Sequence, residues 1–151
     1  MPIQNDMHYN AIKMTIPQAE SILSELFNIK GKITELPGEI DFNFRVKVED
    51  SEGYILKISR PNENQDYLDF QQKLLLHLEH NTNGFTTPQI IKDIKGNVIS
   101  ETVDPQGNQR KVRLLTWVSG RVWSSVNPHS SDILAFTCCN TKFVGGGLLH
   151  S

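Results

Sequence analysis

Residues 33–60, ITELPGEIDFNFRVKVEDSEGYILKISR, decide the fold that the sequence predicts. Side chains alternate along residues 44–48, as is typical of a half-buried β-strand. One face carries Phe44, Val46 and Val48, and the other carries Arg45 and Lys47. Residues 50–53 then form a tight turn in which Gly53 can adopt a positive φ. Residues 54–58 are apolar except for Lys57, so the stretch predicts two or three antiparallel strands with one lysine in the middle of the last.

A lysine inside an apolar strand has two interpretations. It can lie on the solvated face of a hairpin, where its aliphatic stem covers apolar neighbours. Alternatively, Lys57 can contact the phosphates of a nucleotide that lies under the hairpin loop. The strand alone favours the first interpretation, and the elements that follow it favour the second.

The composition is that of a single globular domain. The chain has 151 residues, of which 38% are hydrophobic and 21% charged, and this length accommodates one core. A net charge of −2 gives no general reason to expect binding to nucleic acid or to anionic membranes. The sequence lacks a run of about 18 apolar residues and a secretory signal. The two cysteines, Cys138 and Cys139, are adjacent and fit no disulfide framework, so a reduced cytoplasmic location is predicted.

Two amphipathic helices are predicted on either side of the stretch. The first begins at a T-x-x-Q capping box, with Thr15 as N-cap and Gln18 completing the box, and ends at Gly31. Its apolar stripe consists of Ile16, Ala19, Ile22, Leu23 and Leu26. The second helix runs from about 66 to 80, and its inner stripe consists of Leu68, Gln71, Leu74, Leu75 and Leu78. Both stripes have the spacing of a helix that docks on a core.

Three further strands are predicted after the second helix. Residues 89–94 and 98–103 are joined by Lys95-Gly96-Asn97, a hairpin signal, and residues 104–108 form another turn before a strand over 111–118. The order helix, three strands, helix, three strands predicts an α+β fold with one antiparallel sheet and helices on one side of it.

This order of elements resembles the small lobe of the aminoglycoside phosphotransferase and choline kinase superfamily, and within it hydroxylysine-kinase-like phosphotransferase domains. Four segments carry the likeness, in order: LPGEIDFNFRV, YILKIS, LDFQQKLLLHL and VRLLTWVSG. The resemblance covers roughly residues 14–132 and implies a protein-kinase-like N-terminal lobe at 14–118. A flexible leader at 1–13 is expected before the lobe, and a hinge with a truncated, aberrant or disordered tail at 119–151 after it.

The resemblance assigns roles to particular residues. Lys57 corresponds to the lysine that grips the nucleotide phosphates, and residues 37–44 correspond to the loop between the first two strands. This loop departs from a G-x-G-x-x-G pattern, because only Gly38 is present, followed by Asp41 and Asn43. Backbone N–H groups can still cradle a phosphate there, whereas Asn43 has the equal alternative of a turn residue that bonds its own backbone.

The helix and the hinge complete the predicted nucleotide site. In kinases a glutamate on the following helix holds the lysine, and the alignable positions here are Asp69 and Gln71. Asp69 is nearly opposite the inner stripe, whereas Gln71 lies on it and can accept a hydrogen bond from Lys57 without neutralising its charge. The resemblance implies a hinge whose backbone meets the purine; its residues are Thr116, Trp117 and Val118, with Trp117 mainly a packing residue.

The catalytic loop H-x-D-x-x-x-x-N of this superfamily is absent from residues 119–151. The resemblance therefore implies half of a small-molecule kinase that uses ATP or GTP with Mg²⁺ to phosphorylate a hydroxyl of an amine-bearing metabolite. The Mg²⁺ ligands are expected in the missing lobe, the chain alone is expected to be inactive, and a fused aminotransferase domain can accompany the parent protein. The alternative is a non-catalytic protein-binding module.

Binding of nucleic acid through the sheet is not expected. The predicted strands carry five basic residues, and no aromatic pair that stacks bases is interleaved with them. These residues are Arg45, Lys47, Arg110, Lys111 and Arg113. The simplest prediction for them is a solvated face.

Overall fold

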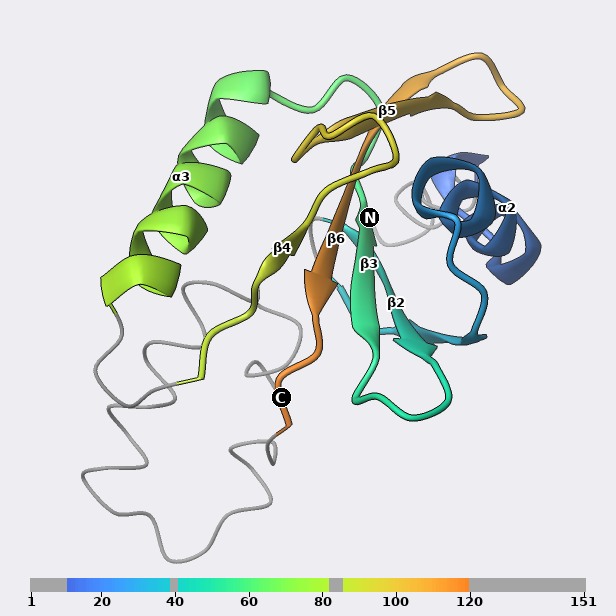
Figure 1. Ribbon diagram of the computed structural model, residues 1–151. Coiled ribbons are helices and arrows are strands. Elements are labelled where there is room, and N and C mark those ends of the chain that lie inside the picture. Colours follow the sequence, from blue (N-terminus) through green and yellow to red (C-terminus); the bar gives the residue numbers. More distant parts are fainter. Residues whose placement is uncertain (1–10, 39–40, 82–85, 120–151) are drawn as a thin grey trace, which may run out of the picture.

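The computed structural model describes residues 11–38, 41–81 and 86–119, and it confirms the predicted α+β lobe with an antiparallel sheet. The elements, shown in Figure 1, are α2 (Ile16–Phe27), β1 (Lys32–Leu36), β2 (Phe42–Lys47), β3 (Tyr54–Ile58), α3 (Gln65–Asn81), β4 (Ile90–Ile91), β5 (Ser100–Val103) and β6 (Gln109–Thr116). The strand order is β1-β2-β3-β6-β4, and β5 also pairs with β6. The tail expected at 120–151 and residues 1–10 of the expected leader lie outside the described residues.

The two helices cover opposite faces of the sheet, which corrects the prediction that both lie on one side (Figure 1). Leu56 on β3 packs in the cluster that contains α2 residues, whereas its neighbour Ile55 packs against Leu75 of α3. Successive side chains of a strand point to opposite faces, so an almost continuously apolar strand such as β3 is buried from both sides. The larger cluster consists of Met14, Ala19, Ile22, Leu23, Phe27, Ile33, Phe42, Phe44, Val46, Leu56, Ile58, Val112 and Leu114.

The alternation along β2 and the turn that follows it are as predicted. Phe44 and Val46 are fully buried, and Lys47 is exposed. Gly53 has a φ of 84°, and a Cβ there would lie 2.1 Å from the carbonyl oxygen of Val46. Only glycine therefore fits at this point of the hairpin between β2 and β3.

Strands β4 and β5 do not form the predicted hairpin with each other. Both pair antiparallel with the same edge of β6, with Ile91 opposite Leu114 and Ser100 opposite Val112. The Lys95-Gly96-Asn97 segment still turns the chain, because the N–H of Gly96 donates to the carbonyl of Asp93. The carboxylate of Asp93 also accepts hydrogen bonds from the backbone N–H of Lys95 and Asn97, and these anchor the turn. Strands β4 and β5 are therefore two parts of one interrupted strand beside β6, and the segment between them leaves the sheet and returns to it.

Helix α2 begins as predicted and ends earlier than predicted. The side chain of Gln18 accepts a hydrogen bond from the backbone N–H of Thr15 at 2.8 Å, which completes the capping box. The helix ends at Phe27, because Asn28 adopts a left-handed conformation with φ 54°. Gly31 serves β1 instead: a Cβ there would lie 2.5 Å from the carbonyl oxygen of Lys47, so glycine allows the two strands to approach.

The prediction of a solvated basic face is wrong for Arg110 and Arg113, whose side chains are 0% and 3% exposed. Arg110 forms an ion pair with Asp104 and donates to the carbonyl oxygen of Ser59 at 3.0 Å. It also donates to the carbonyl oxygen of Ile12 at 2.6 Å, so residue 12 of the expected loose leader contacts the fold. Buried guanidinium groups require such partners, and Arg110 obtains one within its own hairpin and two from distant segments.

No helix in these three described ranges is long and apolar enough to cross a membrane.

Candidate functional site

A row of polar side chains crosses three adjacent strands on the α3 face of the sheet. Lys57 on β3 lies opposite Asn43 on β2 and opposite Arg113 on β6. All three residues are buried, with 7% exposure at Asn43, 5% at Lys57 and 3% at Arg113. Together with Asp41 and Gln71 they are called the polar cluster below. Burial of two cations side by side is unfavourable without negative charge nearby, so the row requires an anionic partner.

Asp41 supplies negative charge within the protein. One of its oxygens, Oδ2, lies 2.5 Å from Arg113 Nη2 and 3.6 Å from Lys57 Nζ. Burial lowers the pKa of Lys57 because the ammonium loses its water, and Arg113 lowers it further. The charge of Asp41 and its hydrogen bond raise the pKa in part, without cancelling the effect of burial. Lys57 is thus a buried lysine that gives up its proton more readily than a surface lysine.

Gln71 joins the polar cluster from α3. Its amide oxygen accepts a hydrogen bond from Arg113 Nη1 at 2.5 Å, so Gln71 reaches the site through the arginine. Asp69 lies off the cluster, as expected from its position, and accepts a hydrogen bond from Gln65 at 2.8 Å. The buried glutamine of α3 is Gln72, which donates to the carbonyl oxygen of Val98 and fixes the helix to the chain beyond β4.

The loop residues predicted to cradle phosphate converge on the same place. A Cβ on Gly38 would lie 2.3 Å from the carbonyl oxygen of Asp41 and 2.3 Å from Asn43 Nδ2, so only glycine fits there. Asn43 Nδ2 is within 3.5 Å of the carbonyl oxygen of Pro37, a long contact across the loop. Asn43 therefore connects β2 to Pro37, and Asp41, two residues before it, lies against Lys57 and Arg113.

The residues of the predicted hinge lie at the end of β6. The backbone N–H of Thr116 donates to Gln89 and that of Trp117 to Gly53, each at 2.9 Å. These two N–H groups are therefore engaged within the lobe, and Val118 follows as a partly buried residue. The Trp117 ring packs against Arg45, whose guanidinium carbon lies 4.0 Å from the ring centroid, in agreement with the packing role expected for this tryptophan.

The cluster has the polar groups that a phosphate requires, but few that a metal requires. Two cations and a loop with room only for glycine suit an oxyanion. The described residues include no group of three or more His, Cys, Asp or Glu side chains that could hold a metal ion. Two buried oxygens of the cluster, Asp41 Oδ1 and Asn43 Oδ1, have no hydrogen-bond partner among the described residues. The cations of the cluster thus suit an oxyanion, and its described residues alone do not form a Mg²⁺ site.

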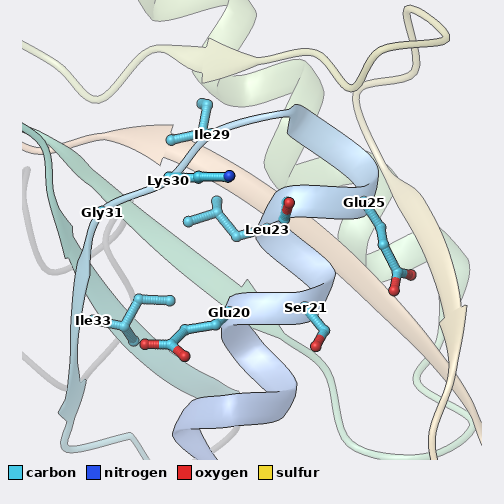
Figure 2. Close-up of a pocket in the computed structure, with 9 residues that line it drawn as sticks. Glu20, Ser21, Leu23, Glu25, Ile29, Lys30, Gly31 and Ile33 are labelled. Carbon is cyan, nitrogen blue, oxygen red and sulfur yellow. The ribbon is translucent and has the colours of Figure 1, made fainter.

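Two pockets lie away from the polar cluster. Figure 2 shows one of about 440 Å³ between α2 and the start of β1, lined by Glu20, Leu23, Lys30 and Ile33 among others. The other, of about 620 Å³, lies between the end of α2 and the turn at 93–101. Neither is lined by a residue of the predicted site.

Sequence reasoning missed Arg113 and the role of Asp41 as a carboxylate partner. Arg113 was predicted to be solvated, yet it lies beside Lys57 in the sheet. The available signal was its place in the apolar part of β6, between Val112 and Leu114. A basic residue within such a strand is buried on one face or the other, and it then needs a partner.

The comparisons with known proteins agree on one type of fold. The model of the phosphotransferase enzyme family matches residues 32–136. A structure of a microcompartment-associated aminopropanol kinase is similar with a TM-score of 0.58 and 18% identity, over 70% of this chain and 32% of that chain. The amicoumacin kinase hAmiN, in complex with AMP-PNP, Ca²⁺ and Ami, gives 0.59 and 16%, over 80% and 35%. No curated protein matches. The chain thus spans about a third of these solved kinases.

Proposed function

This chain belongs to the phosphotransferase enzyme family, and we propose that it is the nucleotide-binding lobe of a small-molecule kinase. Within this lobe, Lys57 is proposed to contact the nucleotide phosphates. The observation that carries the proposal is the burial of Lys57 against Asp41, whose carbonyl oxygen lies close to Gly38. The competing interpretation, a protein-binding module, expects Lys57 to extend into water from the solvated face of the hairpin.

The nucleotide is proposed to be ATP or GTP bound with Mg²⁺, and it supplies the phosphoryl group. The residues described here would bind and orient it: Lys57 and Arg113 would hold phosphate oxygens, and the loop at Gly38 would bring backbone N–H groups close to them. Charge on the phosphates is spread over several oxygens, which cations at fixed positions stabilise. The residues of the hinge, Thr116 to Val118, are proposed to lie beside the base.

The acceptor is proposed to be a hydroxyl group of an amine-bearing metabolite. This is consistent with the names of the two similar kinases, an aminopropanol kinase and an amicoumacin kinase. The chain covers about a third of each, and the catalytic loop expected from the resemblance is not present in its sequence. We therefore expect the chain to bind nucleotide and to transfer no phosphoryl group by itself.

The test is thermal unfolding of the purified chain in increasing Mg·ATP or Mg·GTP. A ligand that binds only the folded state at 100 times its dissociation constant adds about 2.7 kcal/mol to the free energy of unfolding. We expect this stabilisation in the native chain and its loss in Lys57→Ala. The matched control is Lys47→Ala, which removes an exposed lysine on the neighbouring strand and should retain the full response.

A folded chain that neither nucleotide stabilises would contradict the proposal and favour the protein-binding module. Equal responses in Lys57→Ala and the native chain would show that nucleotide binds elsewhere.

A further inference from the structure

We propose that the carboxylate of Asp41 occupies the position of a nucleotide phosphate in the free protein and is exchanged for it on binding, with Arg113 as the second phosphate-binding cation. This inference deepens the proposed function and rests on it for the identity of the ligand. Its central claim, an exchange of one anion for another between Lys57 and Arg113, is tested below without a nucleotide.

The first argument is the geometry of one oxygen. Asp41 Oδ2 lies between two cations from adjacent strands, at 2.5 Å from Arg113 Nη2 and 3.6 Å from Lys57 Nζ. Lys57 and Arg113 are directly opposite each other in the register of β3 and β6, so their side chains leave the same face of the sheet. An oxygen held by two such cations has the environment of a bound phosphate oxygen.

The second argument is that Asp41 is not fully satisfied in this position. Its other oxygen, Oδ1, is buried and has no hydrogen-bond partner in the part of the chain that the structure describes. A buried acceptor that lost its water and gained no donor weakens the hold of the whole group. Asp41 also lies next to the loop around Gly38 rather than within the sheet, at the residue that immediately precedes β2. A carboxylate placed in this way can leave more easily than one bonded through both oxygens.

The third argument is that Arg113 is held independently of Asp41. Gln71 on α3 accepts a hydrogen bond from Arg113 Nη1, whereas Asp41 Oδ2 accepts one from Arg113 Nη2. When the carboxylate leaves, Gln71 keeps the guanidinium directed into the site. A phosphate group with two negative charges also matches a pair of cations better than one carboxylate does.

The test measures binding of inorganic pyrophosphate, without nucleotide or metal, to the full chain and to Asp41→Asn by calorimetry. The variant keeps the shape of the side chain and removes its charge. Removal of a competing negative charge at contact distance should tighten pyrophosphate binding by about tenfold or more. The matched control, Asp66→Asn, removes an exposed carboxylate in the first turn of α3 and should bind as the native chain does. The double variant Asp41→Asn/Arg113→Gln should lose the gain.

Equal or weaker binding by a folded Asp41→Asn would overturn the exchange, as would a gain that survives the loss of Arg113. If Asp41→Asn does not fold, nitrogen-15 NMR of the native chain decides. The side-chain resonance of Arg113 should shift on titration with pyrophosphate, and an unmoved resonance at saturation would overturn the proposal. Failure of the proposed function is distinct: pyrophosphate would bind more tightly to Asp41→Asn while neither chain responded to ATP or GTP. Conversely, nucleotide binding that depends on Lys57, with no gain in Asp41→Asn, would refute only the exchange.

Discussion

At the scale of single residues, the partner of Lys57 comes from a different element than in protein kinases. There a glutamate on the helix after the third strand holds the lysine. Here the carboxylate is Asp41, at the entrance to β2, and the helix contributes the uncharged Gln71 through Arg113. Among the described residues, Arg113 and Asp41 thus link α3 to Lys57.

The burial of Lys57 predicts a pH dependence of stability. The pKa of Lys57 in the folded chain is lowered from the ordinary lysine value of 10.5. At pH values between the folded-state pKa and 10.5, the unfolded chain binds more protons than the folded chain, so the free energy of unfolding rises with pH there. The protonated lysine thus destabilises the folded chain at lower pH. We expect Lys57→Met to be more stable than the native chain near neutral pH, because the variant no longer buries an ammonium group.

Urea unfolding at a series of pH values measures this effect. The advantage of Lys57→Met should shrink as the pH approaches 10.5, the ordinary value for lysine. Lys47→Met, at an exposed position on β2, should show no such trend. A constant difference at every pH would rule out the lysine charge as its cause.

At the scale of elements, the hairpin of β5 and β6 is anchored by a buried ion pair. Asp104 accepts from Arg110 Nε at 2.8 Å, and its backbone and side chain also close the turn with Asn108. Burial alone would raise the pKa of Asp104, but the hydrogen bonds from Asn108 and Arg110 outweigh it and lower the pKa. The same guanidinium reaches Ser59 after β3 and Ile12 before α2, so one side chain connects three elements.

Removal of this carboxylate should be costly. Asp104→Ala leaves Arg110 buried without its anion, and we expect a loss of about 3–5 kcal/mol in the free energy of unfolding. Glu101→Ala, in the same hairpin, breaks an exposed ion pair with Lys111 and should cost at most about 1 kcal/mol. Chemical denaturation of both variants measures the difference. Because the folded pKa of Asp104 is lowered, the native advantage should persist above 3.8 and disappear as the pH falls through the folded value.

Equal losses for the two variants would show that burial does not distinguish the two pairs.

At the scale of the whole molecule, local patterns predicted the elements and missed what joins them. The alternation along 44–48, the capping box at Thr15 and the glycine at 53 are each set by a few neighbouring residues, and each has the expected structure. The pair between Asp41 and Arg113 spans 72 positions, and its existence depends on strand order and register, which a single sequence does not reveal. The order of the elements suggested helices on one side, but the apolar stripe of a helix does not tell which face of the sheet it covers, and α2 and α3 pack on opposite faces of β3.

The central place of β6 has a consequence for how the protein emerges from the ribosome. This strand is the last of the sheet in sequence, yet it pairs with β3 along one edge and with β4 and β5 along the other. Until it is available, β3 presents an unpaired edge rich in apolar residues, which invites pairing with other chains. Translation arrested with residue 108 outside the exit tunnel should therefore leave the nascent chain sensitive to protease, and arrest with residue 116 outside should protect it. Equal protection at both lengths would mean that the first three strands and their helices already form a stable unit during synthesis.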